Sequence, residues 1–330
     1  MGDEWERMIK LDSNENPYGP SPLVLFEIRR HSKEVNRYPL DIGMLEERIA
    51  EKFRVDKGCV LVAAGGDRIL DFLFRVCSKK GKRFLIPVPS FQIYEMLLLK
   101  DVYEVSKRFF KMPINRGGEG TFYDEVRRGD IIVLASPNNP DGRIWSEKYV
   151  RALCEKAEVI ILDEAYMDYL GRSLASLTEE YENLVVVKTF SKLYALANLR
   201  VGYLIGDIAR DVRNLATPYE VSGIGVKASL AALKDEEYYK RIRRLTKKNY
   251  ERLYTTLIDL GFETYGSLAN FVLIKEKLDN MYEKLRKEGV LVRLCERWRG
   301  LEGRYLRISV GTGTETEILL RVIRRIKKNE

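Results

Sequence analysis

Several residue types on which common protein sites depend are scarce in this chain of 330 residues. His31 is the only histidine, and the four cysteines, Cys59, Cys77, Cys154 and Cys295, are widely spaced with no Cys-x-x-Cys pair. These residues form no metal-ligand pattern, so no metal is expected. The cysteines are expected to be free, buried thiols.

Long apolar runs are also missing. No run approaches the roughly 20 residues that would cross a membrane, and the amino terminus, Met-Gly-Asp-Glu, lacks the basic, apolar pattern of a signal peptide. We therefore expect a cytoplasmic protein without a membrane partner. Gln92 is the only glutamine while lysine, arginine and glutamate are abundant, a bias that leans toward a thermophilic source.

The net charge of +8 raises the question of nucleic acid. Basic residues are interspersed with acidic ones, however, and the one dense basic run, 321–328, follows a helical apolar period at the chain end. A basic last turn also complements the helix dipole. We interpret this run as a solvated helix face and expect no nucleic-acid partner.

What the chain does contain is a series of short runs rich in valine, isoleucine and leucine. Strands are predicted at 59–64, 84–88, 102–109, 131–136, 159–163, 184–187 and 201–205. Helical patterns are predicted at 44–53, 67–78, 91–99 and 146–156. Continuous apolar runs, instead of alternation, indicate strands buried on both faces. The fold class is therefore α/β, with a mostly parallel sheet covered by helices.

After residue 226 the pattern of predicted helices and strands changes. A helical stretch to about residue 260, broken or bent near Asp235, is followed by predicted strands at 270–274, 291–294 and 305–310 and by helices at 279–287 and from Thr314. Residues Thr314 to Glu317 are interpreted as a capping box. Residues 11–22, rich in proline, predict an extended arm. We expect a large domain at 35–225 and a smaller α+β domain made of 1–34 and 226–330.

Polar residues follow the predicted strands at the place where ligands bind in an open α/β sheet. The segment Gly65-Gly66-Asp67 opens a helix, and it suits either phosphate binding or a plain turn. Asn139 lies in a turn after the strand at 131–136, where its amide can face a ligand. Asp163 ends an apolar run, so its carboxylate needs a cationic partner, and a protonated pyridine nitrogen would be one.

Lys192 follows the strand at 184–187, with two hydroxyls before it, Thr189 and Ser191, and Arg200 after it. These are the parts of a phosphate-anchored Schiff-base site: an amine for an imine and donors for a phosphate. A lysine after a strand is more commonly solvated, so this pattern alone leaves both interpretations open.

The motifs taken together resemble the fold-type I aminotransferases that use pyridoxal 5′-phosphate, and most closely the histidinol-phosphate aminotransferase family. The resembling segments are Leu-Asp-Ser-Asn-Glu-Asn-Pro-Tyr-Gly-Pro-Ser-Pro (11–22), Arg-Tyr-Pro (37–39), Ser-Pro-Asn-Asn-Pro-x-Gly (136–142), Asp-Glu-Ala-Tyr (163–166), Thr-x-Ser-Lys (189–192) with Arg200, and Leu-Arg-Ile-Ser-Val-Gly-Thr (306–312). Each is short and common, but the ordered set covers nearly the whole chain and favours the imine role for Lys192.

The resemblance implies a role for each residue near the cofactor. Lys192 would form the internal aldimine and carry the proton, Asp163 would pair with the pyridinium nitrogen, and Tyr166 and Asn139 would hydrogen-bond the ring oxygen O3′. Phe91 would stack on the ring. The phosphate would be held by Thr189, Ser191, Arg200, Gly66 and Asp67, with Tyr38 reaching across a homodimer interface from the partner. These roles imply an enzyme with two shared sites per dimer.

The resemblance also implies a substrate. Arg307 and Arg293, on adjacent predicted strands, would hold the phosphate of L-histidinol phosphate, since a dianion favours two guanidinium groups, and Asn14 would bind substrate as well. The amino acceptor would be 2-oxoglutarate, in a step of histidine biosynthesis. Three residues depart from the usual motifs without removing a reacting group: Arg68 after Gly-Gly-Asp, Phe91 and Asp141.

Three alternatives remain at this level. An aromatic amino-acid aminotransferase would accept phenylalanine or tyrosine in place of histidinol phosphate. A threonine-phosphate decarboxylase of cobalamin synthesis, a lyase, shares the fold and much of the motif set. A non-catalytic ligand sensor would need an added DNA-binding segment, and residues 1–34 are too short and proline-rich to supply one.

Overall fold

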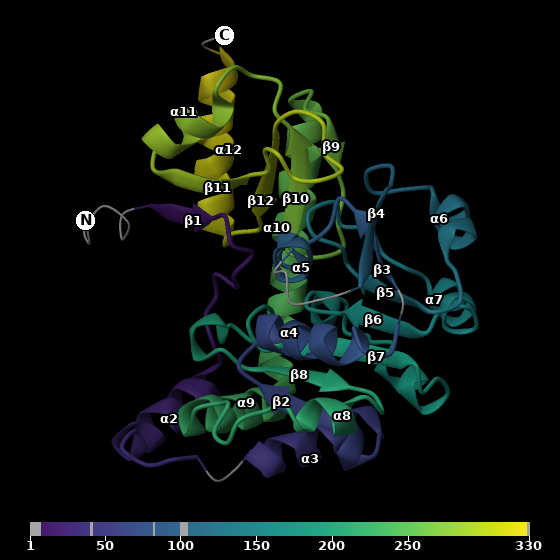
Figure 1. The fold of residues 1–330 in the computed structure, drawn as a ribbon. Helices are drawn as coiled ribbons and strands as arrows, with labels where there is room; N and C mark the ends of the chain where they lie inside the picture. Colours follow the sequence, from purple (N-terminus) through teal and green to yellow (C-terminus); the bar gives the residue numbers. More distant parts are fainter. Residues whose placement is uncertain (1–7, 40–41, 82, 100–104, 329–330) are drawn as a thin grey trace.

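The computed structural model describes residues 8–39, 42–81, 83–99 and 105–328, which form two sheets with helices packed around them (Figure 1). The amino-terminal strand β1 lies beside the carboxy-terminal elements at the upper end of the view, while α2, α3 and α9 gather at the lower end. None of the described helices is long and apolar enough to cross a membrane.

The larger sheet has seven strands and is mostly parallel. In spatial order they are β2 (Val60–Ala63), β8 (Gly202–Ile205), β7 (Leu184–Thr189), β6 (Val159–Asp163), β5 (Asp130–Ala135), β3 (Arg83–Val88) and β4 (Ser106–Lys111). Only β8 runs antiparallel to its neighbours. Alternate residues of these strands belong to two separate apolar clusters, one on each face. The prediction of a parallel sheet buried on both faces is therefore confirmed.

Helices cover both faces of this sheet. One face carries α4 (Gly66–Cys77), α5 (Gln92–Leu98) and α8 (Ala209–Arg213). The opposite face carries α2 (Pro22–His31), α3 (Ile42–Phe53), α6 (Glu119–Glu125), α7 (Glu147–Cys154), α9 (Gly223–Lys234) and the start of α10 (Glu236–Asp259). The break between α9 and α10 falls at Asp235, as predicted. The four cysteines are buried and free, which is also as predicted.

The smaller sheet has five strands. Their order is β1 (Ile9–Leu11), β11 (Val290–Leu294), β12 (Tyr305–Ser309), β10 (Phe271–Lys275) and β9 (Thr264–Tyr265). Helices α10, α11 (Met281–Lys287) and α12 (Gly313–Lys328) pack on it around an apolar cluster of its own. The arm thus begins by pairing in parallel with β11, although α2 packs against α9. The division of the chain into a large domain at 35–225 and a smaller domain made of 1–34 and 226–330 stays a prediction.

Short 3-10 helices complete the chain: η1 (Ser32–Glu34), η2 (Lys57–Cys59), η3 (Met167–Leu170), η4 (Ala175–Glu179) and η5 (Ala197–Leu199). The sequence prediction has no counterpart for α2, for these 3-10 helices or for β1, α6, α8 and β9, and the last four are too short to show a period. The predicted strand at 102–109 is found from Ser106 onwards, and its first residues, 102–104, lie outside the described chain.

One local prediction is wrong. The capping box of the last helix is not formed by Thr314 and Glu317. Instead Thr312 Oγ1 accepts from the Glu315 backbone N–H at 3.2 Å, and Glu315 Oε2 accepts from the Thr312 N–H at 2.7 Å. Both pairs have the same spacing, but α12 begins at Gly313, so Thr314 already lies inside its first turn.

Candidate active site

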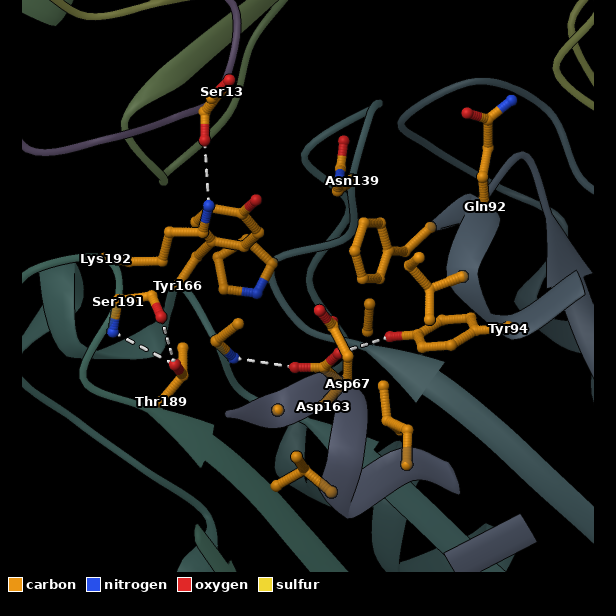
Figure 2. Close-up of a pocket in the computed structure, with 18 of the residues that line it drawn as sticks. Ser13, Asp67, Gln92, Tyr94, Asn139, Asp163, Tyr166, Thr189, Ser191 and Lys192 are labelled. Carbon is orange, nitrogen blue, oxygen red and sulfur yellow. Dashed lines mark hydrogen bonds between the residues drawn. The ribbon is translucent and has the colours of Figure 1, made fainter. Parts of the chain in front are cut away.

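A cavity of about 320 Å³ opens where β5, β6 and β7 end, between the two sheets. It brings together residues that are up to 295 positions apart (Figure 2). Twelve of the predicted site residues line it: Gly66, Asp67, Phe91, Asn139, Asp163, Tyr166, Thr189, Ser191, Lys192, Arg200, Arg293 and Arg307. Asn14 and Tyr38 do not.

Asp163 lies at the end of β6 and is 7% exposed. One carboxylate oxygen accepts the Ala165 backbone N–H at 2.9 Å, and the other accepts the hydroxyl of Tyr94 at 2.6 Å. No lysine or arginine of the described chain forms an ion pair with it. Burial therefore raises the pKa of Asp163, and the hydrogen bond from Tyr94 opposes that rise. A buried carboxylate without a cation fits a protonated ring nitrogen.

Lys192 approaches the same space from the loop after β7. Its Nζ donates to the backbone carbonyl of Ser13 at 2.9 Å and lies 5.5 Å from the centre of the Tyr166 ring. No carboxylate of the described residues pairs with this ammonium group, in contrast to the buried Lys188 nearby. The amine is therefore held by a neutral carbonyl, a contact that a reacting group can displace.

Donors suited to a phosphate lie at one end of the cavity. The Thr189 hydroxyl donates to Ser191 Oγ at 3.0 Å, and Arg200 Nη2 lies 3.1 Å from Asp67 Oδ2. Helix α4 begins beside them with the unpaired N–H groups of its first turn. Gly65 has a φ of +87°, and a Cβ there would come within 2.7 Å of the Arg200 guanidinium. The glycine thus permits the arginine to reach the helix start.

The other end of the cavity is formed by the smaller sheet and the arm. Arg307, on β12, is 6% exposed, and its Nη1 donates to Asn139 Oδ1 at 2.7 Å. Its Nη2 donates to the Asp12 carbonyl at 2.5 Å, and its Nε has no partner. Arg293 is the cross-strand neighbour of Arg307 and is exposed. Burial lowers the pKa of Arg307, and Arg293 adds to the effect.

Two predicted site residues lie outside the cavity. Asn14 is fully buried behind Tyr166 and donates from Nδ2 to the Tyr166 hydroxyl at 3.0 Å. Tyr38 is 75% exposed on the surface and stacks on Tyr219 with 4.4 Å between ring centres. Asn14 therefore contacts the site through Tyr166, and Tyr38 makes no contact with the cavity of its own chain.

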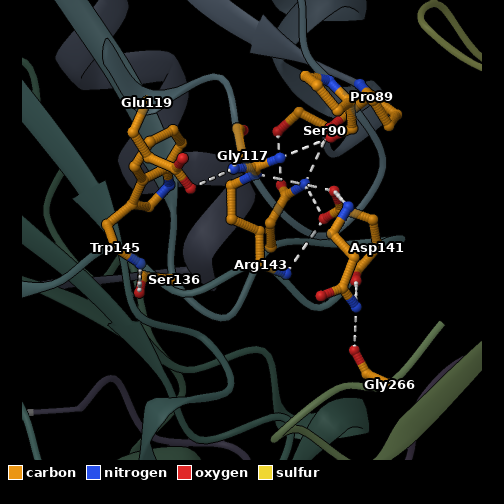
Figure 3. Close-up of polar contacts among 12 residues, drawn as sticks. Pro89, Ser90, Gly117, Glu119, Ser136, Asp141, Arg143, Trp145 and Gly266 are labelled. Carbon is orange, nitrogen blue, oxygen red and sulfur yellow. Dashed lines mark hydrogen bonds and ion pairs between the residues drawn. The ribbon is translucent and has the colours of Figure 1, made fainter. Parts of the chain in front are cut away.

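The turn that carries Asn139 is held by a buried network around Asp141, which is 1% exposed (Figure 3). Asp141 accepts from Asn138 Nδ2 at 2.6 Å and from the backbone N–H groups of Asn115 and Arg143 at 2.8 and 3.2 Å. Asn115 also donates to the Gly266 carbonyl, close to the smaller sheet. Burial raises the pKa of Asp141. The departure from the usual motif residue at 141 thus links this turn to both sheets.

Several lining residues were missed by sequence reasoning, notably Tyr94, Ser13 and Trp298. Tyr94 could have been found, because it follows Phe91 by three positions on the predicted helix and so lies on the same side. Ser13 acts through its backbone carbonyl, which no residue pattern reveals. Trp298 lies in a loop whose course depends on the smaller sheet, and it is 4% exposed.

Comparison with known proteins agrees with this geometry. The family model of aminotransferase class I and II matches residues 6–326. Histidinol-phosphate aminotransferase 1 of Archaeoglobus fulgidus is 35% identical over 329 residues, covering 97% of this chain and 99% of the relative. Histidinol-phosphate aminotransferase 2 of the same organism is 33% identical over 327 residues, covering 97% and 94%.

Two solved structures share the fold. Histidinol-phosphate aminotransferase from Sinorhizobium meliloti, in complex with pyridoxal-5′-phosphate, superposes with a TM-score of 0.83 at 22% identity over 98% of this chain and 91% of that one. L-threonine-O-3-phosphate decarboxylase from Porphyromonas gingivalis gives 0.85 at 23% identity over 97% and 100%. The expected fold-type I architecture is confirmed. The chain therefore belongs to the aminotransferase class I and II family and is an aminotransferase whose cofactor is pyridoxal 5′-phosphate.

Proposed function

We propose that this enzyme transfers the amino group of L-histidinol phosphate to 2-oxoglutarate, giving imidazole acetol phosphate and glutamate, as a step of histidine biosynthesis. The names of the relatives described above support the substrate. The observation that carries the proposal is the pair Arg293 and Arg307 at one end of the cavity.

These two arginines suit a dianion better than a single carboxylate. Neither guanidinium forms an ion pair within the described part of the chain, and Arg307 keeps one buried N–H without a partner. A phosphate ester offers three oxygens and close to two negative charges to such a pair. A carboxylate, as in glutamate, would use Arg307 alone. Arg293 is therefore the residue that we propose selects the phosphorylated amine.

The cofactor, when bound, supplies a carbonyl that condenses with amines and a ring that stores the electrons of the broken Cα–H bond. We propose that Lys192 Nζ would accept the proton from the substrate Cα and hold it during the reaction. Asp163 holds the proton on the ring nitrogen, because an ionised carboxylate at that position favours the cationic form. Asn139 and Tyr166 orient the ring oxygen, and Asn14 holds the Tyr166 hydroxyl in place.

The cofactor's phosphate is proposed to lie among Thr189, Ser191, Arg200 and the backbone N–H groups of Gly66 and Asp67. This set has two hydroxyls, one guanidinium and a helix N-terminus, which together suit a dianion. The ion pair of Arg200 with Asp67 positions the guanidinium beside the helix start. Phe91 lines the same cavity as Asp163, and its ring is proposed to stack on the cofactor.

A homodimer is part of the proposal. Tyr38 is exposed and does not line the cavity of its own chain; it stacks on the exposed Tyr219, and Val35, three positions earlier, is exposed as well. A second copy would cover them and bring Tyr38 to the partner's phosphate site. Mixing inactive Lys192→Ala with inactive Tyr38→Ala tests this, since a mixed dimer regains one intact site. No recovery of activity after subunit exchange would contradict the shared site.

The substrate proposal is tested by single half-reactions of the purified holoenzyme, followed by the visible spectrum of the cofactor. Histidinol phosphate and glutamate are each expected to change the visible spectrum of the bound cofactor, whereas phenylalanine is not. Arg293→Met should weaken the binding of histidinol phosphate by about 10-fold or more, because one charge-assisted contact is lost, and should leave the binding of glutamate nearly unchanged. Conversion by phenylalanine or tyrosine without conversion by histidinol phosphate would replace the proposal with an aromatic aminotransferase.

A second candidate is a threonine-phosphate decarboxylase. The structural likeness to the Porphyromonas enzyme covers both chains almost completely, and a pair of arginines would receive that phosphate equally well. Release of carbon dioxide from O-phosphothreonine, without any keto acid, would favour this lyase. If no carbon dioxide is released from O-phosphothreonine while histidinol phosphate is converted rapidly, the decarboxylase function is excluded.

A further inference from the structure

A second cavity of about 520 Å³ is lined in part by Tyr194, two residues after Lys192. It is formed by the end of α3, the segment from η3 to η4, the end of α9 and the first turns of α10. Five of its lining residues are cations: Arg48, Lys52, Arg54, Arg172 and Arg243. We call this the basic cavity. Nothing in the proposed reaction uses it.

The charges of the basic cavity are not balanced from within. Among the described residues, only Arg48 of the five cations forms an ion pair, with Glu51 at 2.9 Å. Both lining carboxylates are already engaged elsewhere. Asp168 lies 3.1 Å from the buried Lys188, which also pairs with Glu164, and Glu236 lies 3.4 Å from Lys240. Lys52, Arg54, Arg172 and Arg243 therefore face one space in which these four cations without an ion pair outnumber the two lining carboxylates.

Two of these cations are held in place by neutral groups. Lys52 Nζ donates to the Tyr194 hydroxyl at 2.9 Å, and Arg243 Nη1 donates to the backbone carbonyl of Asp168 at 3.4 Å. Desolvation lowers the pKa of Lys52, Asp168 and Glu236 raise it, and the neighbouring Lys188 and Arg243 lower it further. An anion placed between Lys52 and Arg243 would relieve this unfavourable field.

We propose that the basic cavity binds a small, multiply charged phosphate-bearing anion. Guanidinium groups match the geometry of phosphate oxygens with two parallel N–H bonds, and three of the four unpaired cations are arginines. A concave site also focuses positive potential, which scattered surface lysines do not. The apolar walls, which include Phe53, Leu233 and Tyr239, limit the occupant to a small molecule instead of an extended polymer.

The basic cavity is separate from the catalytic one but shares its supporting segments. Tyr194 is two residues from Lys192, and Asp168 is two residues from Tyr166. Lys188, which fixes Asp168, directly precedes Thr189. The two cavities therefore have no lining residue in common, but residues that line them follow one another closely along the chain.

Calorimetric titration of the holoenzyme with inorganic pyrophosphate at low ionic strength tests the proposal, since bound cofactor already occupies the Arg200 site. Up to two pyrophosphates per chain are expected, one in the basic cavity and one at Arg293 and Arg307 of the catalytic cavity. The double variant with Lys52→Met and Arg243→Met should bind pyrophosphate in the basic cavity about 10-fold more weakly or worse, because two charge-assisted contacts are lost. Arg172→Gln, an exposed position whose change leaves the fold intact, should weaken binding severalfold on its own.

Two controls separate this site from its competitors. Arg293→Met removes a cation of the catalytic cavity, and Arg210→Gln removes a surface cation paired with Asp56. Arg210→Gln should bind pyrophosphate as the unchanged enzyme does, whereas Arg293→Met should weaken only the binding in the catalytic cavity and keep the binding in the basic cavity. The proposal is overturned if pyrophosphate does not bind at millimolar concentration, if only Arg293→Met abolishes binding, or if all the variants weaken it equally. Cofactor absorbance and thermal unfolding verify that each variant is folded.

Discussion

Replacing Tyr94 by phenylalanine probes the electrostatics of the cofactor site with a single missing hydroxyl. Tyr94 is 1% exposed and packs edge-on against Phe91 at 5.7 Å between ring centres. Phenylalanine keeps these apolar contacts. Only the 2.6 Å hydrogen bond to Asp163 is lost, and the carboxylate then keeps the Ala165 N–H alone.

The expected magnitude follows from the charge on the acceptor. A hydrogen bond to a charged group contributes about 1.5–3 kcal/mol, which is about 10- to 100-fold in the ratio of ionised to protonated Asp163, at 1.4 kcal/mol per factor of ten. Burial already raises the pKa of Asp163, and the Tyr94 hydroxyl opposes that rise. The variant should therefore have a still higher Asp163 pKa.

A protonated Asp163 cannot pair with a protonated ring nitrogen, so affinity falls as pH drops through the Asp163 pKa. In Tyr94→Phe this fall should begin at higher pH, and on its acidic side the cofactor should bind about 10-fold or more weakly than in the unchanged enzyme. At a pH well above the Asp163 pKa of either protein, the unchanged enzyme and Tyr94→Phe should bind the cofactor with the same affinity.

Fluorescence titration of the cofactor-free protein with pyridoxal 5′-phosphate over a pH series measures this effect. Asp163→Asn is the matched control, because it removes the ionising group, and the effect of Tyr94→Phe should vanish in that background. A pH profile that does not move, or that moves toward acid, would refute the role of the hydroxyl. A uniform loss of affinity at every pH would instead indicate a packing defect.

The remaining predictions concern buried charges and the reacting lysine. Lys188→Met leaves Glu164 and Asp168 without their shared cation. Urea unfolding should show that the free energy of unfolding falls by about 3–5 kcal/mol, and a fall below about 1 kcal/mol would contradict this role of Lys188. Asp141→Asn exchanges an acceptor for a donor opposite existing N–H donors, so thermal unfolding should show a loss of about 1–3 kcal/mol, whereas unchanged stability would argue against the network. Lys192→Ala should lose the visible band of the bound cofactor, and persistence of that band as an enzyme-linked imine would exclude Lys192.

Much of the larger sheet could be predicted because its strands are continuous runs of valine, isoleucine and leucine. Val159–Asp163 was predicted with the observed bounds, since the apolar run stops at a carboxylate. Short elements could not be predicted in this way. The three residues of β1 become a strand only because β11 offers backbone partners, and the capping box of α12 depends on where the helix starts.

The sequence by itself determined the class of fold and suggested the proposed cofactor residues Asp163, Lys192 and Arg200, because polar residues that follow apolar runs are local patterns. Only the tertiary structure decided how distant groups meet. It placed Tyr94 on Asp163, Ser13 on Lys192, and Arg293 beside Arg307 through the register of β11 and β12. The physical reason is that hydrogen bonds and charge pairing between distant segments depend on packing, and packing is set by the whole chain rather than by neighbouring residues.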